Sequence, residues 1–238
     1  MKKILAALLL TLPTMAVAID LEDYYITAKG GVSKTMDTGT ASFGQVGIIY
    51  PSLKDDDLGT GSAFGFSVGK YLNDNFRLEL EVTKRTSYEL DTYVLQAPTD
   101  FDTANIDTTS LFINSFYDFQ PLTISNTSIT PYVGGGIGIS RNKMGITTQL
   151  ANGVPFSFIE GHTTSEFAYK FSAGTLLSLT EQLSLDVSYQ YVNLGEFEEG
   201  TEVYGDGLRR ADLDAQKGAN GGEIKTQELM VGLQYTFK

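Results

Sequence analysis

The stretch "NFRLELEVTKR", residues 75–85, decides how the chain folds, because charged and apolar side chains alternate along it. Successive side chains of a strand point to opposite sides, so Arg77, Glu79 and Glu81 share one face. The opposite face carries an unbroken apolar stripe, which consists of Phe76, Leu78, Leu80 and Val82. The stretch therefore predicts a β-strand with one charged and one apolar face, and it leaves open which of the two meets water.

The same alternation recurs along the chain and predicts eight strands. The expected strands are Tyr24–Lys34, Ser62–Leu72, Phe76–Thr86, Thr109–Phe119, Ile129–Arg141, Glu166–Leu179, Leu183–Asn193 and Glu228–Phe237. The expected short turns are Asn73–Asn75, Thr180–Gln182 and the slightly longer Gln120–Ser128. The long links are Thr35–Gly61, Ser87–Thr108, Asn142–Ser165 and Leu194–Gln227. Because short and long connections alternate, every long link falls at the same end, which is typical of transmembrane β-barrels.

Three features predict that the charged face points into a barrel. The charged face also carries many glycines, which relieve crowding in an interior only wide enough for side chains. Aromatic residues end the apolar stripes, as in the girdles of membrane barrels; they are Tyr24, Tyr25, Tyr71, Phe76, Tyr117, Phe119, Tyr189, Tyr191, Tyr235 and Phe237. The closing run "GLQYTFK", residues 232–238, is expected to pair with the first strand, so that no sheet edge meets lipid.

Inside such a barrel, basic side chains are expected to pair with acidic ones, because an unpaired buried charge is costly. The predicted structural ion network consists of Lys29, Arg77, Glu79, Glu81, Asp118, Lys170, Asp186 and Glu228. Four apolar residues, Phe112, Phe116, Leu176 and Met230, also fall on the inward parity. Either a bulge or an apolar layer inside the barrel explains them.

The N-terminal residues have the form of a secretory signal peptide, with two lysines, a short apolar run and "AVA" at 16–18. We expect a signal peptide at 1–18, cleavage after Ala18, and one barrel domain at 19–238. The chain has no cysteine and a net charge of −12, so a disulfide framework is excluded and nucleic acid is an improbable partner. The expected location is the bacterial outer membrane.

The runs "YLNDNFRLELEVTKR", "NSFYDF", "ITPYVGGGIGIS", "FAYKFSAGTLLSLTEQLSLDVSYQYVNLG" and "GLQYTFK" resemble the opacity-type surface antigens. These are small eight-stranded outer-membrane barrels, related in architecture to the barrel of outer-membrane protein A. The resemblance covers the expected strands and short turns, about half of the chain after the signal peptide. It implies surface-exposed loops and roles in adhesion to host cells or in envelope integrity. It also implies that the barrel assembly machinery recognises the C-terminal strand ending at Phe237, here followed by Lys238.

Motifs that suggest chemistry have simpler explanations. His162, the only histidine, lies near Glu160, Ser165 and Glu166, but no recognisable hydrolase motif surrounds it. The acidic stretches at 54–57 and 196–214 lack the spacing of a calcium loop, and "GGGIG" at 134–138 lies within a strand. We therefore expect no enzyme activity, catalytic residue, metal site or cofactor.

The long links contain aromatic residues among acids, which is a composition favoured at binding surfaces. The candidates for contact with a partner are Tyr88, Tyr93, Phe101, Phe156, Phe158, Phe197 and Tyr204. An equally good interpretation is that these residues extend the hairpins above the membrane, and "ANGV" at 151–154 is a good hairpin turn.

The sequence thus predicts an all-β protein, an eight-stranded antiparallel transmembrane barrel with short periplasmic turns and four long extracellular loops. Its expected function is a structural and interaction role at the cell surface, in contact with outer-membrane lipid and with a host or cell-surface ligand. A wide pore is not expected. The alternative is a soluble periplasmic carrier of apolar ligands, with Leu78, Leu80, Val187 and Val231 inside. A weaker alternative is an outer-membrane hydrolase.

Overall fold

The computed structural model describes residues 21–36, 43–45, 48–50, 57–93, 101–124, 127–205, 208–210 and 221–237. Its barrel strands are β1 (Tyr24–Thr35), β4 (Thr60–Tyr71), β5 (Phe76–Tyr93), β6 (Phe101–Asp118), β8 (Thr127–Met144), β11 (His162–Ser178), β12 (Leu183–Glu198) and β15 (Gly221–Thr236). Shorter strands are β2 (Phe43–Gln45), β3 (Ile48–Tyr50), β7 (Leu122–Ile124), β9 (Thr147–Ala151), β10 (Val154–Ile159), β13 (Val203–Gly205) and β14 (Leu208–Arg209). The expected signal peptide and its cleavage after Ala18 lie outside these ranges and stay predictions.

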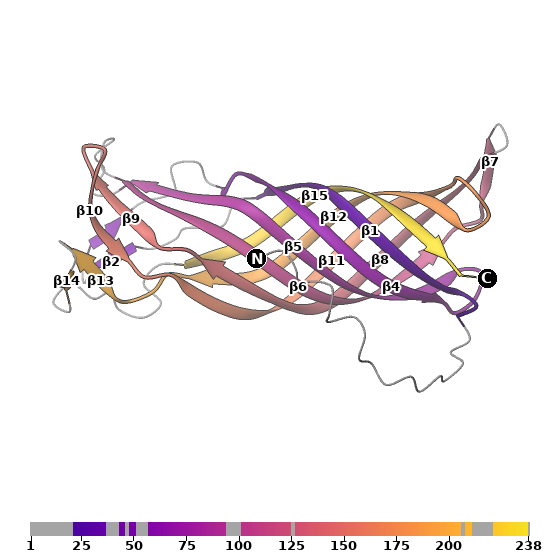
Figure 1. The fold of residues 1–238 in the computed structure, drawn as a ribbon, viewed down its shortest axis with the longest axis horizontal. Coiled ribbons are helices and arrows are strands. Elements are labelled where there is room, and N and C mark those ends of the chain that lie inside the picture. The colour runs from indigo at the N-terminus through magenta and orange to yellow at the C-terminus, as the bar shows by residue number, and fades with distance from the viewer. Residues whose placement is uncertain are drawn as a thin grey trace, which may run out of the picture.

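The eight long strands close into a barrel in which each strand is antiparallel to its neighbours (Figure 1). Strand β1 closes it, because it pairs with β4 on one side and with β15 on the other. The register runs from Tyr25 opposite Thr236 to Thr35 opposite Thr226. The predicted fold class is confirmed. Within the described ranges, no helix is long and apolar enough to cross a membrane.

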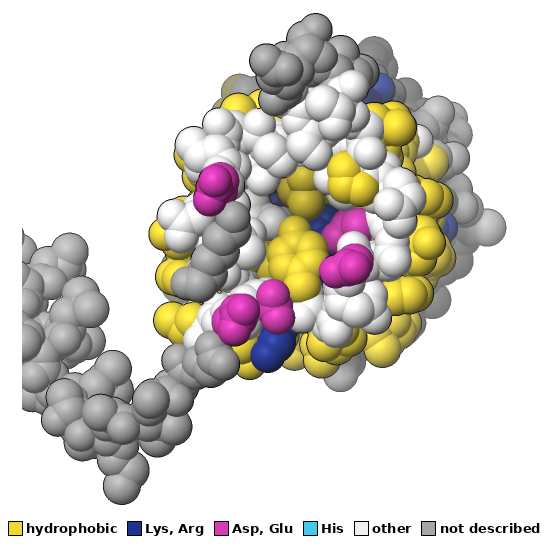
Figure 2. Space-filling view, turned by 90° about the vertical axis from the view of Figure 1, so that its right-hand side faces the viewer, with side chains coloured by type: hydrophobic (Ala, Val, Ile, Leu, Met, Phe, Trp, Pro, Cys, Tyr) yellow, Lys and Arg dark blue, Asp and Glu magenta, His cyan; other side chains and the backbone are white. Residues whose placement is uncertain are grey.

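The outer wall of the barrel is apolar, and the interior is lined by polar and charged side chains. Leu78, Leu80 and Val231 are exposed by 42%, 52% and 47%, whereas Glu79 and Glu81, which alternate with the leucines, are buried. Figure 2 looks into the end that carries the short turns, here called the turn end; apolar side chains ring the outside and acidic ones lie at the opening. The soluble-carrier alternative is therefore wrong, because the stripe it places inside faces outward.

The interior accommodates large side chains because glycines of neighbouring strands leave room for them. A Cβ on Gly174 would lie 2.6 Å from the ring of Tyr132, and one on Gly232 would lie 2.7 Å from the Cβ of Lys29. On β8, a Cβ at Gly138 would overlap the carbonyl oxygen of Leu111 on β6. The predicted role of the inward glycines in relieving crowding is confirmed.

Two of the predicted girdle aromatics point inward instead. Tyr25 is fully buried, and its ring lies 5.2 Å from that of Tyr71, whose hydroxyl accepts a hydrogen bond from Gln234 at 2.9 Å. The prediction of a girdle position is wrong for both residues. Tyr25 has the parity of the buried Thr27 and Lys29 on β1, and Tyr71 has the parity of the buried Ser67 on β4.

The four apolar residues of inward parity are buried inside the barrel without a register shift near them. Phe116 and Leu176 form a cluster with Tyr132 towards the turn end, and Phe112 belongs to a larger cluster on the other side of the ionic residues. The alternative of an apolar layer is therefore the correct one.

The strands extend further than the alternation predicts. Strands β5 and β6 continue through most of residues 87–108, expected as a long link, and pair as far as Tyr93 opposite Phe101. The prediction of a long loop for this stretch is wrong. Its apolar side chains point inward and its charged ones outward, which is the reverse of the arrangement in the lower part of the barrel. Tyr88, Leu90 and Ile106 point inward and are buried, while Glu89 on the outside is exposed.

Candidate functional site: the barrel interior and the loop end

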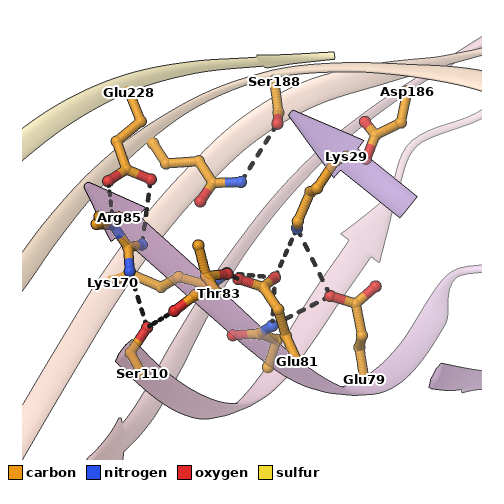
Figure 3. A network of polar contacts seen from close by, with 12 residues as sticks. Lys29, Glu79, Glu81, Thr83, Arg85, Ser110, Lys170, Asp186, Ser188 and Glu228 are labelled. Atoms are coloured by element: carbon orange, nitrogen blue, oxygen red, sulfur yellow. Dashed lines mark hydrogen bonds and ion pairs between the residues drawn. The ribbon is translucent and has the colours of Figure 1, made fainter. Parts of the chain in front are cut away.

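Glu81 lies at the centre of the buried ion network and contacts two lysines from opposite sides of the barrel (Figure 3). Its Oε2 is 2.5 Å from Lys29 Nζ on β1 and 2.7 Å from Lys170 Nζ on β11. The hydroxyl of Thr83 donates a hydrogen bond to Glu81 Oε1 at 2.6 Å. Glu79 lies 3.9 Å from Lys29. Two acidic residues of β5, Glu79 and Glu81, thus contact the two lysines. Such bridging ties together strands that are not neighbours in the sheet.

A second buried ion pair joins Arg85 to Glu228. Arg85 donates from Nε at 2.5 Å and from Nη2 at 3.2 Å, which makes a bidentate contact (Figure 3). Ser33 and Thr226 donate further hydrogen bonds to Glu228 Oε1, at 2.8 and 2.9 Å. Arg85 is absent from the predicted network, although its parity with Arg77, Glu79, Glu81 and Thr83 on β5 would have identified it.

A third group lies towards the turn end. Arg77 Nε donates to Asp118 at 3.1 Å, and the guanidinium lies 4.4 Å from the ring of Phe116 and 4.5 Å from that of Tyr132. Tyr132 donates a 2.7 Å hydrogen bond to Asp186. All eight residues of the predicted network are buried, but Asp186 accepts this hydrogen bond and forms no ion pair within the described ranges.

An apolar cluster covers the ion network on the side of the long links, here called the loop end. It is formed by Leu58, Tyr88, Leu90, Ala104, Ile106, Phe112, Met144, Ala168, Val192, Leu194, Phe197 and Ile224. The interior is thus filled in layers, aromatic at the turn end, ionic in the middle and apolar at the loop end. This filling leaves the described part of the barrel without a wide passage.

At the loop end, the sheet continues beyond the barrel as an ordered extension, here called the loop-end sheet: β9, β10, β13 and β14 (Figure 1). β9 pairs with β6 and with β10, and β10 pairs in turn with β13. Asn152 and Gly153 have φ values of 51° and 75°, as a type I′ hairpin turn requires. The predicted hairpin at "ANGV" is confirmed, and the interpretation that the links extend the hairpins is correct for this stretch.

The predicted aromatic contact residues divide into three groups. Tyr88 and Phe197 are buried in the apolar cluster, so their prediction as exposed contact residues is wrong. Phe158 is 43% exposed and Tyr204 is half-buried; they lie opposite each other in the pairing of β10 with β13. Tyr93, Phe101 and Phe156 lie on strands, but their side chains are outside the described part of the structure.

Polar contacts fix the exposed face of β13 and β14. Tyr204 donates a 2.6 Å hydrogen bond to Glu202, and Arg209 lies 3.3 Å from the same carboxylate. The hydrogen bond to Glu202 raises the pKa of the Tyr204 hydroxyl. The face therefore presents aromatic rings beside one paired acid and one paired base.

The remaining motifs form no recognisable chemical centre. His162 begins β11 and lies opposite Met144, half-buried. Asp57 Oδ1 accepts a hydrogen bond from the backbone of Gly59 at 2.8 Å. Among the residues that the structure describes, no three His, Asp or Glu side chains are grouped as a metal site would need. Residues 54–56, 206, 212 and 214 of the acidic stretches lie outside the described ranges.

A closed antiparallel barrel with an apolar wall and a filled polar interior defines a transmembrane β-barrel. Residues 4–237 match the family described as "Outer membrane protein beta-barrel domain", and the chain belongs to this family. It is a protein of the bacterial outer membrane, and the resemblance to small outer-membrane barrels is confirmed.

The relatives agree with this assignment. The chain is 27% identical to "Outer membrane protein PagN" of Salmonella typhimurium over 93% of each chain. Among solved structures, OprG from Pseudomonas aeruginosa matches with a TM-score of 0.56 and 15% identity, over 91% of this chain and 96% of that one. Neisserial surface protein A matches with a TM-score of 0.53 and 18% identity, over 91% and 98%. These likenesses support the barrel fold.

Proposed function

We propose that the protein is a non-enzymatic surface protein that contacts a host or neighbouring cell through the loop-end sheet. The observation that carries this proposal is the exposed face of β10, β13 and β14 that holds Phe158, Tyr204 and Arg209. Phe158 is 43% exposed, and it lies opposite Tyr204, which lies opposite Arg209, on short, paired strands. Exposed apolar side chains on a rigid surface are typical of binding sites, because binding then costs little ordering.

The filled interior supports the same proposal by leaving little room for transport. The lumen contains ion pairs, aromatic rings and an apolar cluster, whereas a pore needs an open aqueous path. The names of two similar proteins are compatible with a surface role. One is an outer-membrane protein of Salmonella typhimurium, and the other is a surface protein of Neisseria. His162 has no partner arrangement of the kind that hydrolysis requires among the described side chains, and this favours the non-enzymatic proposal.

We also propose that the barrel assembly machinery recognises strand β15 together with Phe237. The outward stripe of β15 is formed by Leu229, Val231, Leu233 and Tyr235, and it is exposed. The Phe237 ring continues the stripe, with its centroid 5.2 Å from that of Tyr235.

The test compares bacteria that carry the wild-type protein, a deletion, or single variants, in adherence to cultured epithelial cells and in leakage of a periplasmic enzyme. Phe158→Ser should lower adherence almost to the level of the deletion strain, because it removes the exposed aromatic ring. Ile146→Ser is the matched control, since Ile146 is 62% exposed at the same end but lies outside the strands of the loop-end sheet. Surface labelling and heat-modifiable gel migration verify that each variant is folded and displayed.

The outcomes separate interaction from a structural role. Loss of adherence in Phe158→Ser with normal leakage supports the proposal. A deletion strain that adheres normally but leaks would overturn it and would favour a structural role in the envelope. Equal losses in Phe158→Ser and Ile146→Ser would show that the loop-end sheet is not the contact surface.

A further inference from the structure

We propose that three basic side chains on the outer wall, Lys84, Arg141 and Lys143, bind the phosphate groups of lipid headgroups in the outer leaflet. We call them the basic collar. Lys84 is on β5, whereas Arg141 and Lys143 are on β8, and all three are exposed. The collar is separate from the loop-end sheet and does not depend on its partner.

The collar lies directly above the lipid-facing wall. Lys84 lies opposite Thr109, which lies opposite Arg141, so these residues form one row across β5, β6 and β8. Two residues closer to the turn end, the next outward row is Val82, Leu111, Ile139 and Phe167, and every member is exposed and apolar. The change from apolar to basic within two residues marks the depth at which lipid headgroups begin.

The three cations are close enough to share one headgroup. Lys84 and Arg141 are two strand spacings apart, about 10 Å, and Arg141 and Lys143 are about 7 Å apart along β8. Both side-chain types have long stems that can lie along an apolar surface while the charged end reaches the headgroup region. Arginine adds a planar fork that suits phosphate oxygens.

Among the residues that the structure describes, the cations of the collar are not paired with acids. None of its three members forms an ion pair within the described ranges. The nearest acid by register is Asp107, opposite Lys143 on β6, and no contact within ion-pair distance joins them. By contrast, Lys34 and Lys225 at the same end lie against Asp57 and Glu223.

The distribution of charge along the wall points to an anionic leaflet on one side. Of the outward-facing cations on the described barrel strands, Lys70 alone lies at the turn end, with its ammonium 4.5 Å from the ring centre of Tyr24. The others, Lys34, Lys84, Arg141, Lys143 and Lys225, lie at the loop end. A chain with a net charge of −12 has few cations to place, and simple solubility does not require them at this end, since acids would serve equally. Attraction to anionic headgroups does require cations.

The experiment measures binding of diphosphorylated lipid A to the full-length barrel in neutral detergent micelles, by native mass spectrometry in the presence of EDTA. The triple variant Lys84→Gln, Arg141→Gln, Lys143→Gln should bind about 10- to 100-fold more weakly, as expected for the loss of three headgroup contacts. The matched control is Lys34→Gln, Lys70→Gln, Lys225→Gln, which changes the net charge equally on the same wall. It should bind like the wild type, because Lys34 and Lys225 are already paired with Asp57 and Glu223 and Lys70 lies at the turn end. Heat-modifiable migration verifies folding of both variants.

Two further arms identify the ligand. Lipid A without its phosphates should bind to wild type as weakly as lipid A binds to the collar variant. Inorganic phosphate at millimolar concentration should not displace lipid A, because the acyl chains also contact the wall. The proposal is overturned if both triple variants bind equally, if dephosphorylated lipid binds as well, or if free phosphate displaces the lipid.

Discussion

At the scale of single residues, Glu81 is the side chain on which the interior depends most. Its carboxylate is fully buried and serves two ammonium groups, Lys29 and Lys170, from strands β1 and β11. Buried ion pairs are weak evidence of net stability, but removing one partner is costly, because the other charge stays buried. Removing the Glu81 carboxylate leaves two buried ammonium groups with one counter-charge fewer.

We expect Glu81→Ala to lower the free energy of unfolding by about 3–5 kcal/mol, the usual effect of breaking a buried pair. The control is Glu89→Ala on the same strand, which removes an exposed carboxylate and should change stability by less than about 0.5 kcal/mol. Urea titration in lipid vesicles, followed by the heat-modifiable gel shift, measures both variants. Equal midpoints for the two variants would contradict a central role for Glu81.

At the scale of elements, β15 both closes the barrel and carries the aromatic terminus. The backbone N–H of Phe237 donates to the carbonyl of Tyr24 at 2.8 Å, so the pairing with β1 continues to the end of the described chain. The ring of Phe237 packs edge-on against Tyr235. Strand β15 thus closes the barrel and, under our proposal, is also recognised during assembly.

We expect Phe237→Ala to lower the amount of folded barrel in cells severalfold, while the purified variant refolds in vesicles like the wild type. The matched control is Phe119→Ala at the same end, whose ring also lies 5.2 Å from a tyrosine, Tyr117. Both changes remove an equal aromatic contact, so a defect confined to Phe237→Ala in cells reports recognition. If both variants fold poorly in vesicles, the terminal ring acts through stability instead.

At the scale of the whole molecule, the barrel is a filled wall with an ordered extension above it. Ion pairs connect strands across the lumen, and apolar side chains close it at the loop end. The outer wall meets lipid, the collar lies at the headgroup depth, and the loop-end sheet projects beyond. Each activity that we propose is therefore located on the outer surface.

We expect the purified protein to form no stable channels in planar lipid bilayers, because side chains fill the lumen over its described length. Discrete, long-lived conductance steps at neutral pH would contradict this expectation. A porin purified and reconstituted in the same way is the positive control for insertion.

The sequence by itself determined the barrel, its strand number and the inward direction of the charged face. Dyad alternation assigns each side chain of a strand to one of two faces, and the cost of a charge in lipid, about 2–4 kcal/mol for Lys or Arg, decides which face is inside. The stretch "NFRLELEVTKR" is sufficient for that choice, and Arg85 lies on the same inward face of it as Glu79 and Glu81.

Only the tertiary structure decided the ion-pair partners and the fate of the long links. Arg85 and Glu228 are 143 residues apart and meet because the closed barrel brings β5 and β15 to face each other across the lumen. Above the membrane no lipid is present, so apolar side chains point inward there and polar ones outward. Residues such as Tyr88 and Phe197 therefore form a core instead of a contact surface. A periodic pattern specifies the side of a strand, whereas the neighbours on that side depend on closure and register.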